Sequence, residues 1–203
     1  MTSFDLPQLI ALAAVLGFAS GLRLYAVLLV VGLVGYAGWV QLPPGLEVLS
    51  HPAVLAVAGV MFVAEFFADK IPALDTLWDA VHTFIRIPAG AALAAAALGA
   101  DHATWAVIGA LLGGTLAATS HFTKAGTRAA VNTSPEPVSN IVVSTSEDLL
   151  VGGLLWLVLK FPLAAAAVVL LLAAVAAWLL PKLFRFVRRV FLRRSNTSST
   201  STG

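Results

Sequence analysis

Four titratable residues follow one another at helical spacing in a chain that otherwise carries few charges. They are Asp75, Asp79, His82 and Arg86, at positions i, i+4, i+7 and i+11, so a helix would carry them on one stripe. Three interpretations fit such a stripe: a polar pathway for ions or protons, a divalent-metal site, or a salt-bridged helix at an interface. Because no spacing here is diagnostic of a metal site, we assign no metal ligand and expect no cofactor.

The composition of the chain indicates that it lies in a membrane rather than in water. Of its 203 residues, 60% are hydrophobic and 11% are charged, and the mean hydropathy is +0.95. A helix of about 20 apolar residues crosses a bilayer, and the sequence contains apolar segments of this order. We therefore predict an all-α fold, a polytopic transmembrane helix bundle of about six spans, at residues 6–38, 53–68, 78–98, 103–122, 138–160 and 162–180.

The first apolar segment is too long for one simple crossing. As a straight helix it would reach roughly 50 Å, so it must tilt strongly or break, and Gly21 is a plausible place for a break. Arg23 follows, far from both ends of the segment. A charge at this depth indicates either a ligand-facing or gating residue or a structural ion pair. Its candidate partners are Glu65, Glu147 and Asp148.

Basic residues predict the orientation, because cytoplasmic loops are enriched in Lys and Arg. With both termini inside, the cytoplasmic side receives nine Lys and Arg and the outer side only Lys160. We therefore expect a bacterial inner-membrane protein with both termini cytoplasmic. Glu65, Asp69 and Lys70 then lie at the cytoplasmic mouth of the bundle, together with Asp75, Asp79 and His82.

The second inner loop carries a similar set of polar residues. His121, Lys124 and Arg128 would form a basic stripe that grips an anionic head group, a phosphate or a carboxylate, or else anchors the loop as the positive-inside rule requires. Three further polar residues enter the next span and must face protein or water: Asn140, Glu147 and Asp148. Aligning the two loops at Lys70 and Lys124 suggests a weak internal repeat.

The predicted spans contain pairs of small residues but no recognised catalytic motif. Gly17 with Gly21, and Gly109 with Gly113, are typical of close helix approach or of chain breaks that line a cavity. There is no cysteine and no recognised catalytic motif, so the sequence assigns no enzymatic activity. An intramembrane hydrolase would have to be built from Ser144, Ser146 and His121.

The end of the chain has a different composition. Residues 1–181 make the bundle, 182–194 a basic amphipathic juxtamembrane helix, and 195–203 a disordered tail. The basic segment predicts binding of anionic lipids at the bilayer surface. No nucleic-acid motif is present, so we expect the lipid bilayer as the partner, no nucleic acid, and a homo-oligomer as a further option.

Short motifs along the chain carry a family resemblance. They are "ASGLR", "ADKIP" with the acids around it, "KAG" with its flanking His121 and Arg128, and "SEDLL". Together they resemble a bacterial integral-membrane family catalogued as domain of unknown function 4126, over nearly the whole chain up to about Pro181. The resemblance implies a small polytopic membrane protein. It implies no activity and no catalytic residues.

Two functions from different classes follow. The first is a small inner-membrane transporter or channel-like protein with a polar intramembrane site for an ion or an anionic substrate such as a lipid phosphate. The second is a non-transporting scaffold whose charges are structural and whose basic tail binds lipid or partners. The residues expected to line the pathway are Arg23, Glu65, Asp69, Lys70, Asp75, Asp79, His82, Arg86, His121, Lys124, Arg128, Asn140, Glu147 and Asp148.

Overall fold

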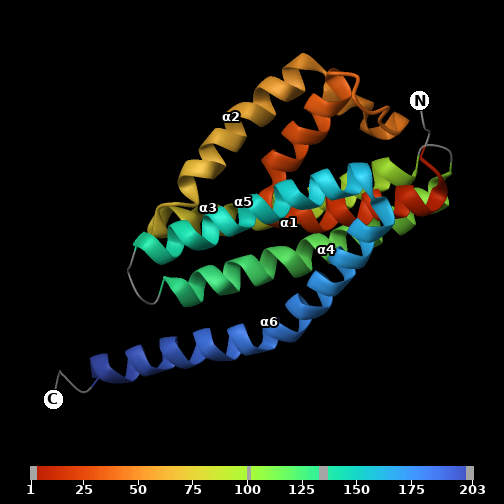
Figure 1. Ribbon diagram of the computed structural model, residues 1–203. Coiled ribbons are helices and arrows are strands. Elements are labelled where there is room, and N and C mark those ends of the chain that lie inside the picture. The colour runs from red at the N-terminus through yellow and green to blue at the C-terminus, as the bar shows by residue number, and fades with distance from the viewer. Residues whose placement is uncertain (1–3, 100–101, 133–136, 200–203) are drawn as a thin grey trace.

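The protein is a bundle of helices in a computed structural model that describes residues 4–99, 102–132 and 137–199. No strand occurs among these residues, which confirms the all-α class. The elements, shown in Figure 1, are α1 (Leu6–Tyr36), the 3-10 helix η1 (Pro44–Ser50), α2 (Pro52–Ala68), α3 (Pro72–Leu98), α4 (Ala103–Val131), α5 (Pro137–Lys160) and α6 (Pro162–Ser199).

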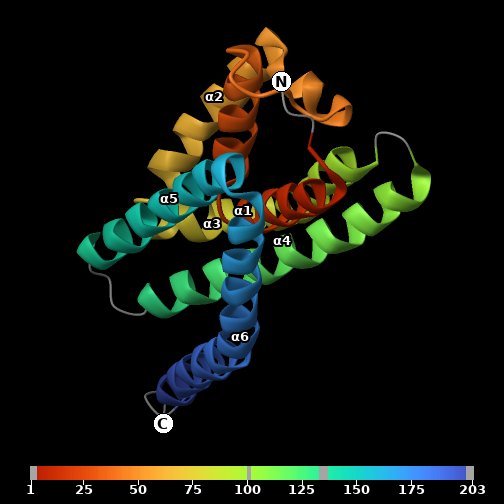
Figure 2. The ribbon, with the colours of Figure 1, turned by 45° about the vertical axis from the view of Figure 1, so that its right-hand side comes forward.

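Helix α1 is broken in its middle, as its length predicts. Arg23 has φ −144° and ψ 76°, outside the helical region, and the two halves of α1 meet there at a sharp bend (Figures 1 and 2). Both ends of α1 return to the same end of the bundle, because Phe4 and Gln8 line one cavity with Gly38 and Gln41. Helix α1 is therefore a hairpin, and the alternative of one tilted crossing over residues 6–38 is wrong.

Glycines let the first half of α1 lie directly against α4. A Cβ atom on Gly17 would lie 2.5 Å from the Cα atom of Gly113, and one on Gly21 would collide with the carbonyl of Ala117. Helix backbones approach this closely only where side chains are absent. The two GxxxG patterns therefore serve close helix contact, as one of the sequence interpretations holds.

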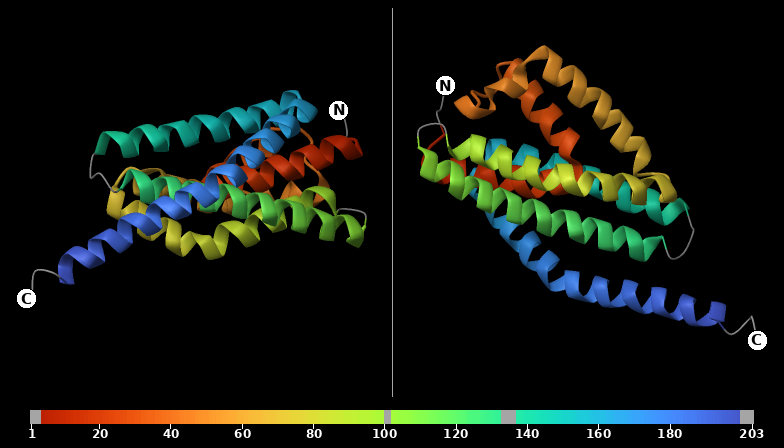
Figure 3. Two further views of the ribbon diagram at one scale, coloured as in Figure 1. Left: turned by 90° about the horizontal axis from the view of Figure 1, so that it is seen from below. Right: turned by 180° about the vertical axis from the view of Figure 1, so that it is seen from behind.

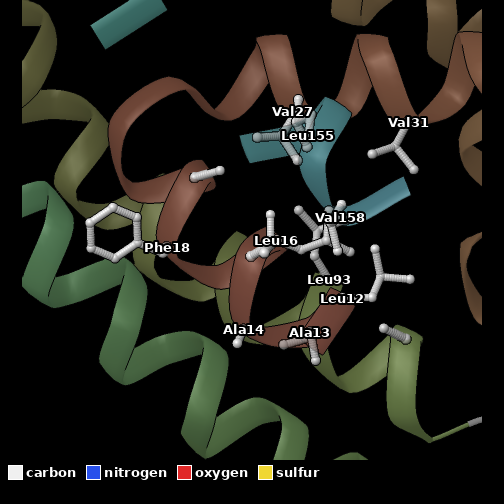
Figure 4. Close-up of a cluster of buried hydrophobic side chains, with 14 of the residues drawn as sticks. Leu12, Ala13, Ala14, Leu16, Phe18, Val27, Val31, Leu93, Leu155 and Val158 are labelled. Atoms are coloured by element: carbon white, nitrogen blue, oxygen red, sulfur yellow. The ribbon is translucent and has the colours of Figure 1, made fainter. Parts of the chain in front are cut away.

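The first half of α1 forms the centre of the core. It is apolar on every face, which is typical of a helix that is buried all round, and nearly all of Ala11–Tyr25 is buried. Figure 4 shows Leu12 and Leu16 beside Leu93 of α3 and Val158 of α5, in one cluster with Val27 from the second half of α1. The outer helices expose their apolar faces, as expected of helices that face lipid.

The number of crossings follows from this arrangement. In the described part of the chain, five helices are long and apolar enough to span a membrane, and η1 with α2, bent by 70°, makes a sixth candidate. With α1 folded back, α2 to α6 run from one end of the bundle to the other (Figures 1 and 3). The start of α1 and the end of α6 consequently lie at opposite ends of the bundle (Figure 1). Six full crossings would have put them at the same end, so the expectation that both termini share one side does not fit the fold.

Several helices are longer than predicted. Helix α3 begins at Pro72 rather than residue 78, and α4 continues to Val131 rather than ending at residue 122. Lys124 consequently lies inside α4, whereas Lys70 follows the end of α2, so the two lysines paired by the suggested repeat have different surroundings. Helix α6 contains Pro181, is bent, and continues to Ser199 (Figure 1). The tail predicted at 195–203 includes residues 200–203, which lie outside the described part of the chain.

The hairpin predicts which residues share a side of the membrane. The natural chain has no cysteine, so single cysteines report position without interference. We expect Leu6→Cys and His102→Cys to react with an impermeant maleimide from one side of the membrane, and Arg185→Cys from the other, when intact cells and inverted vesicles are compared. Labelling of Leu6→Cys and Arg185→Cys from the same side would contradict the hairpin.

Candidate functional site

The polar residues singled out in the sequence gather in one place inside the bundle. We call this set the charge cluster. It draws on α1, the end of α2, and α3, α4 and α5, and its hydrogen-bonded or ion-paired members are Arg23, Glu65, Asp69, Lys70, Asp75, Asp79, Arg86, His121, Lys124, Arg128, Asn140, Glu147 and Asp148. His82 lies apart from these pairs. It stacks on Trp78 and contacts the hydroxyl of Tyr25 at 3.2 Å.

Arg23 reaches the charge cluster from the bend of α1. Its guanidinium forms an ion pair with Asp69 at the C-cap of α2, and its Nε lies 3.0 Å from Asp148 Oδ1 on α5. It also donates to the hydroxyl and the carbonyl of Ser144, at 2.8 and 3.0 Å. The side chain is 1% exposed. One residue therefore ties α1 to two other helices.

The bend also leaves backbone carbonyls of α1 available to α4. Lys124 Nζ donates to the carbonyl of Leu22 at 3.2 Å, and Ser120 Oγ donates to the carbonyl of Phe18 at 2.7 Å. Such bonds stabilise backbone carbonyls inside a bilayer, where no water can take their place. Helix α4 supplies these donors, and its lysine simultaneously lies 2.7 Å from Asp69 Oδ2.

The two aspartates on the stripe of α3 each lie near a basic residue. Asp75 lies 3.7 Å from Arg128 Nε, and Asp79 lies near Arg86. Arg86 lies 2.6 Å from both Glu65 Oε1 and Asp79 Oδ1, and it is fully buried. Arg128 lies 2.9 Å from Glu147 Oε2 and donates to Asn140 Oδ1 at 2.6 Å. The opposite face of α3 is exposed, with Phe84 83% accessible. The stripe thus faces protein, as its helical spacing predicts.

The charges of the cluster do not balance. It contains five bases, Arg23, Lys70, Arg86, Lys124 and Arg128, and six acids, Glu65, Asp69, Asp75, Asp79, Glu147 and Asp148. With both histidines neutral and all carboxylates ionised, five positive against six negative charges leave one negative charge over. Four buried carboxylate oxygens also lack a hydrogen-bond partner: Glu65 Oε2, Asp69 Oδ1, Asp75 Oδ1 and Asp79 Oδ2.

Three of these carboxylates stand close enough to share an ion. Asp69, Asp75 and Asp79 each offer one oxygen within 4.8 Å of the others, and all three side chains are buried. Oxygen ligands of this kind suit hard cations. His82, which the stripe interpretation grouped with these acids, points to Tyr25 and Trp78 instead and is not part of the group.

The charge cluster is closed in this conformation. Most of its members are less than 10% exposed, and only Lys70 and Asp148 have side chains that are 23% and 24% exposed. Burial lowers the pKa of Lys70, which lies between α2 and α3. The larger described cavities are elsewhere: one of about 480 Å³ lies between α4 and α6, beside Phe122 and Leu183, and one of about 370 Å³ lies at the Phe4 end. Lys70 and Asp148 therefore mark the accessible edge of the cluster.

Two hydroxyl residues that contact the charge cluster, Ser144 and Thr83, were not among the residues expected to line the pathway. Ser144 binds Arg23 and lies one turn before Asp148, a spacing that could have marked it. Thr83 contacts His121 Nε2 at 2.7 Å and lies one turn before Arg86. Ser144 and His121 thus have different partners, and this arrangement does not assemble the hydrolase considered above.

Comparison with protein families assigns the chain. It belongs to the family described as Domain of unknown function (DUF4126), whose model matches residues 10–182. The match covers the break of α1 at Arg23 and every residue of the charge cluster. No curated protein and no solved structure matches the chain in the corresponding searches. Family membership therefore supports the resemblance seen in the motifs and leaves activity to be inferred from the site.

The ion pairs of Arg86 predict a large effect on stability. Arg86→Ala would leave the buried Glu65 without its ion-pair partner and Asp79 with Lys124 alone, at 3.5 Å. Breaking a buried pair in this way costs about 3–5 kcal/mol. The double variant Glu65→Gln/Arg86→Gln removes one charge of each sign, so we expect it to retain most of the stability. Thermal unfolding in detergent tests this, with the exposed Arg185→Ala as control. Equal stability of Arg86→Ala and wild type would show that the pair contributes nothing.

Proposed function

We propose that the protein is a small multi-pass transporter or channel-like membrane protein, and that the charge cluster is its ion site. The observation that carries the proposal is the break of α1 at Arg23, which brings a buried arginine and the carbonyl of Leu22 into a cluster with an excess of carboxylate. Broken helices that expose backbone groups near the midplane are a recurrent way to bind ions in transporters. Intramembrane charges are also expensive, which favours a functional reason for keeping them.

The sign of the cluster favours a cation as the transported ion. Each of the buried bases Arg23, Arg86, Lys124 and Arg128 has at least one carboxylate partner, so none is free for a phosphate or carboxylate substrate. The acids, in contrast, keep unpartnered oxygens. Of the substrates that the sequence allows, an ion of positive charge is therefore better supported than a lipid phosphate.

Transport also requires the closed cluster to open. Lys70 and Asp148 are its most exposed members, and they lie 3.8 Å apart. Asp148 pairs with Arg23, and Lys70 contacts Ser144, which accepts hydrogen bonds from Arg23. We place the entrance beside them. Opening there would separate α5 from the turn after α2, while the glycine contacts between α1 and α4 could remain intact.

Orientation and partners complete the proposal. The end of the bundle with Lys70, Arg128 and the basic half of α6 carries most of the basic residues. Under the positive-inside rule this supports a cytoplasmic location for that end, in a bacterial inner membrane as we propose. The end with Phe4 then faces outward. Exposed Lys182 and Arg185 are placed to contact anionic lipid. A homo-oligomer stays a prediction.

A second candidate is the non-transporting scaffold. The many ion pairs and the low exposure of the charge cluster favour it, because a closed, fully paired cluster would rigidify a bundle without moving an ion. In this case the charges would be replaceable by neutral residues of similar volume, provided that both partners of a pair are changed together.

Flux measurements separate the two candidates. Proteoliposomes with wild-type protein should take up a monovalent cation faster than protein-free liposomes. Asp79→Asn should lower this flux by about tenfold or more, the equivalent of roughly 1.4 kcal/mol in a barrier, because Asp79 contacts both Arg86 and Lys124. The exposed Glu47→Gln is the matched control and should behave as wild type.

The outcome that favours the scaffold is equally specific. Wild-type flux equal to that of empty liposomes for Na⁺, K⁺ and protons would overturn the proposal. So would a correctly folded Asp79→Asn variant with unchanged flux, since the charge cluster would then lie off the path. Folding of each variant is checked by its elution profile and its melting temperature.

A further inference from the structure

Three aspartates within the charge cluster form a group with the geometry of an ion site. Asp69 caps the C-terminus of α2, and Asp75 and Asp79 lie one turn apart on α3. One oxygen from each lies within 4.8 Å of the other two. Oxygens that bind one hard cation at about 2.3–2.6 Å can stand at most about 5 Å apart. The spacing therefore allows one cation to contact all three carboxylates.

The unpartnered oxygens of these aspartates supply a second observation. Asp69 Oδ1, Asp75 Oδ1 and Asp79 Oδ2 are buried and have no hydrogen-bond partner, and the three side chains are between 0% and 3% exposed. For Asp69 and Asp79 the bases use the other oxygen: Lys124 and Arg23 contact Asp69 Oδ2, and Arg86 contacts Asp79 Oδ1. Asp75 Oδ1 has only Arg128 Nε near it, at 3.7 Å, which is too long for a hydrogen bond. A buried carboxylate oxygen without a partner is costly. A cation, which accepts electron pairs from oxygen, would remove this cost for all three.

The charge count selects the valence of that ligand. Six carboxylates and five bases leave a single negative charge. A monovalent cation would make the cluster neutral, whereas a divalent cation would leave it positive, with Lys124 Nζ only 3.5 Å from Asp79 Oδ1. We propose that Asp69, Asp75 and Asp79 bind one monovalent alkali cation, of which sodium is the probe used below.

Among the three aspartates, Asp75 has the weakest contacts with the bases of the cluster. Its ion pair with Arg128 Nε is long, at 3.7 Å, and Asn132 Nδ2 lies 3.4 Å from its other oxygen. Asp69 and Asp79, in contrast, each have a base within 2.7 Å. Removing the charge of Asp75 should therefore weaken cation binding with the least damage to the network that holds the helices.

This site deepens the proposed transport function, since it names the class of ion, and it rests on that function only for what the binding achieves. Binding and transport are measured separately. Binding without flux would overturn the transport proposal and keep the site. Flux that persists without any alkali-cation binding would keep transport and overturn the site.

The test is the melting temperature of the purified, full-length protein in detergent micelles at fixed pH. NaCl, KCl and LiCl are titrated against choline chloride at constant ionic strength. A bound ion stabilises the folded state in proportion to the logarithm of its concentration above Kd. For a chain of this size we expect a rise of roughly 3–6 °C for each tenfold increase in the preferred cation, and no rise with choline. The series identifies sodium, potassium or lithium as the ion.

Two variants complete the test. Asp75→Asn should lose at least about three quarters of the cation-dependent rise, and Glu47→Gln, which is exposed in η1, should retain it. The wild-type titration stands alone if Asp75→Asn does not fold. Identical melting temperatures in all four chlorides would overturn the proposal. Stabilisation by Mg²⁺ or Ca²⁺ alone, by acid without any alkali-cation effect, or an unchanged rise in folded Asp75→Asn would overturn it as well.

Discussion

An arginine inside a bilayer must be paired, and in this protein the pairing of Arg23 determines the shape of the helix that carries it. Helix α1 leaves helical geometry at this residue, which directs the guanidinium to Asp69, Ser144 and Asp148. The same bend turns the carbonyl of Leu22 to Lys124. The cost of an unpaired charge in hydrocarbon thus explains why an otherwise apolar helix folds back on itself.

The charge cluster links helices that the apolar core alone would leave free to slide. Apolar packing in a membrane has little directional preference because lipid chains compete with side chains on equal terms. Ion pairs to Asp69, Glu65 and Glu147, in contrast, fix the positions of α2, α3, α4 and α5 relative to one another. A displacement of any of these helices changes several pairs together. Such a network favours a small number of discrete arrangements over continuous motion.

The sequence predicted the composition of the site better than the path of the chain. Helical spacing placed Asp75, Asp79 and Arg86 on one inward stripe, because the physics of that pattern is local to one helix. The break at Arg23 could be expected from the length of its segment. That α1 returns to its starting side could not, since length and hydropathy are the same for a hairpin and for a crossing. Ser144 and Thr83 were left out of the predicted pathway because a hydroxyl in a helix usually bonds its own backbone.

The distance along the chain between Arg23 and Ser144 bears on how the protein is made. These residues are separated by 121 positions, so a ribosome completes α1 long before α5 exists to receive the guanidinium. During that interval Arg23 can pair with Asp69, 46 positions along the chain, but not with Ser144 or Asp148. The fold described here becomes available only once the fifth helix has entered the membrane. The set of partners that holds Arg23 is therefore complete only after most of the chain has been made.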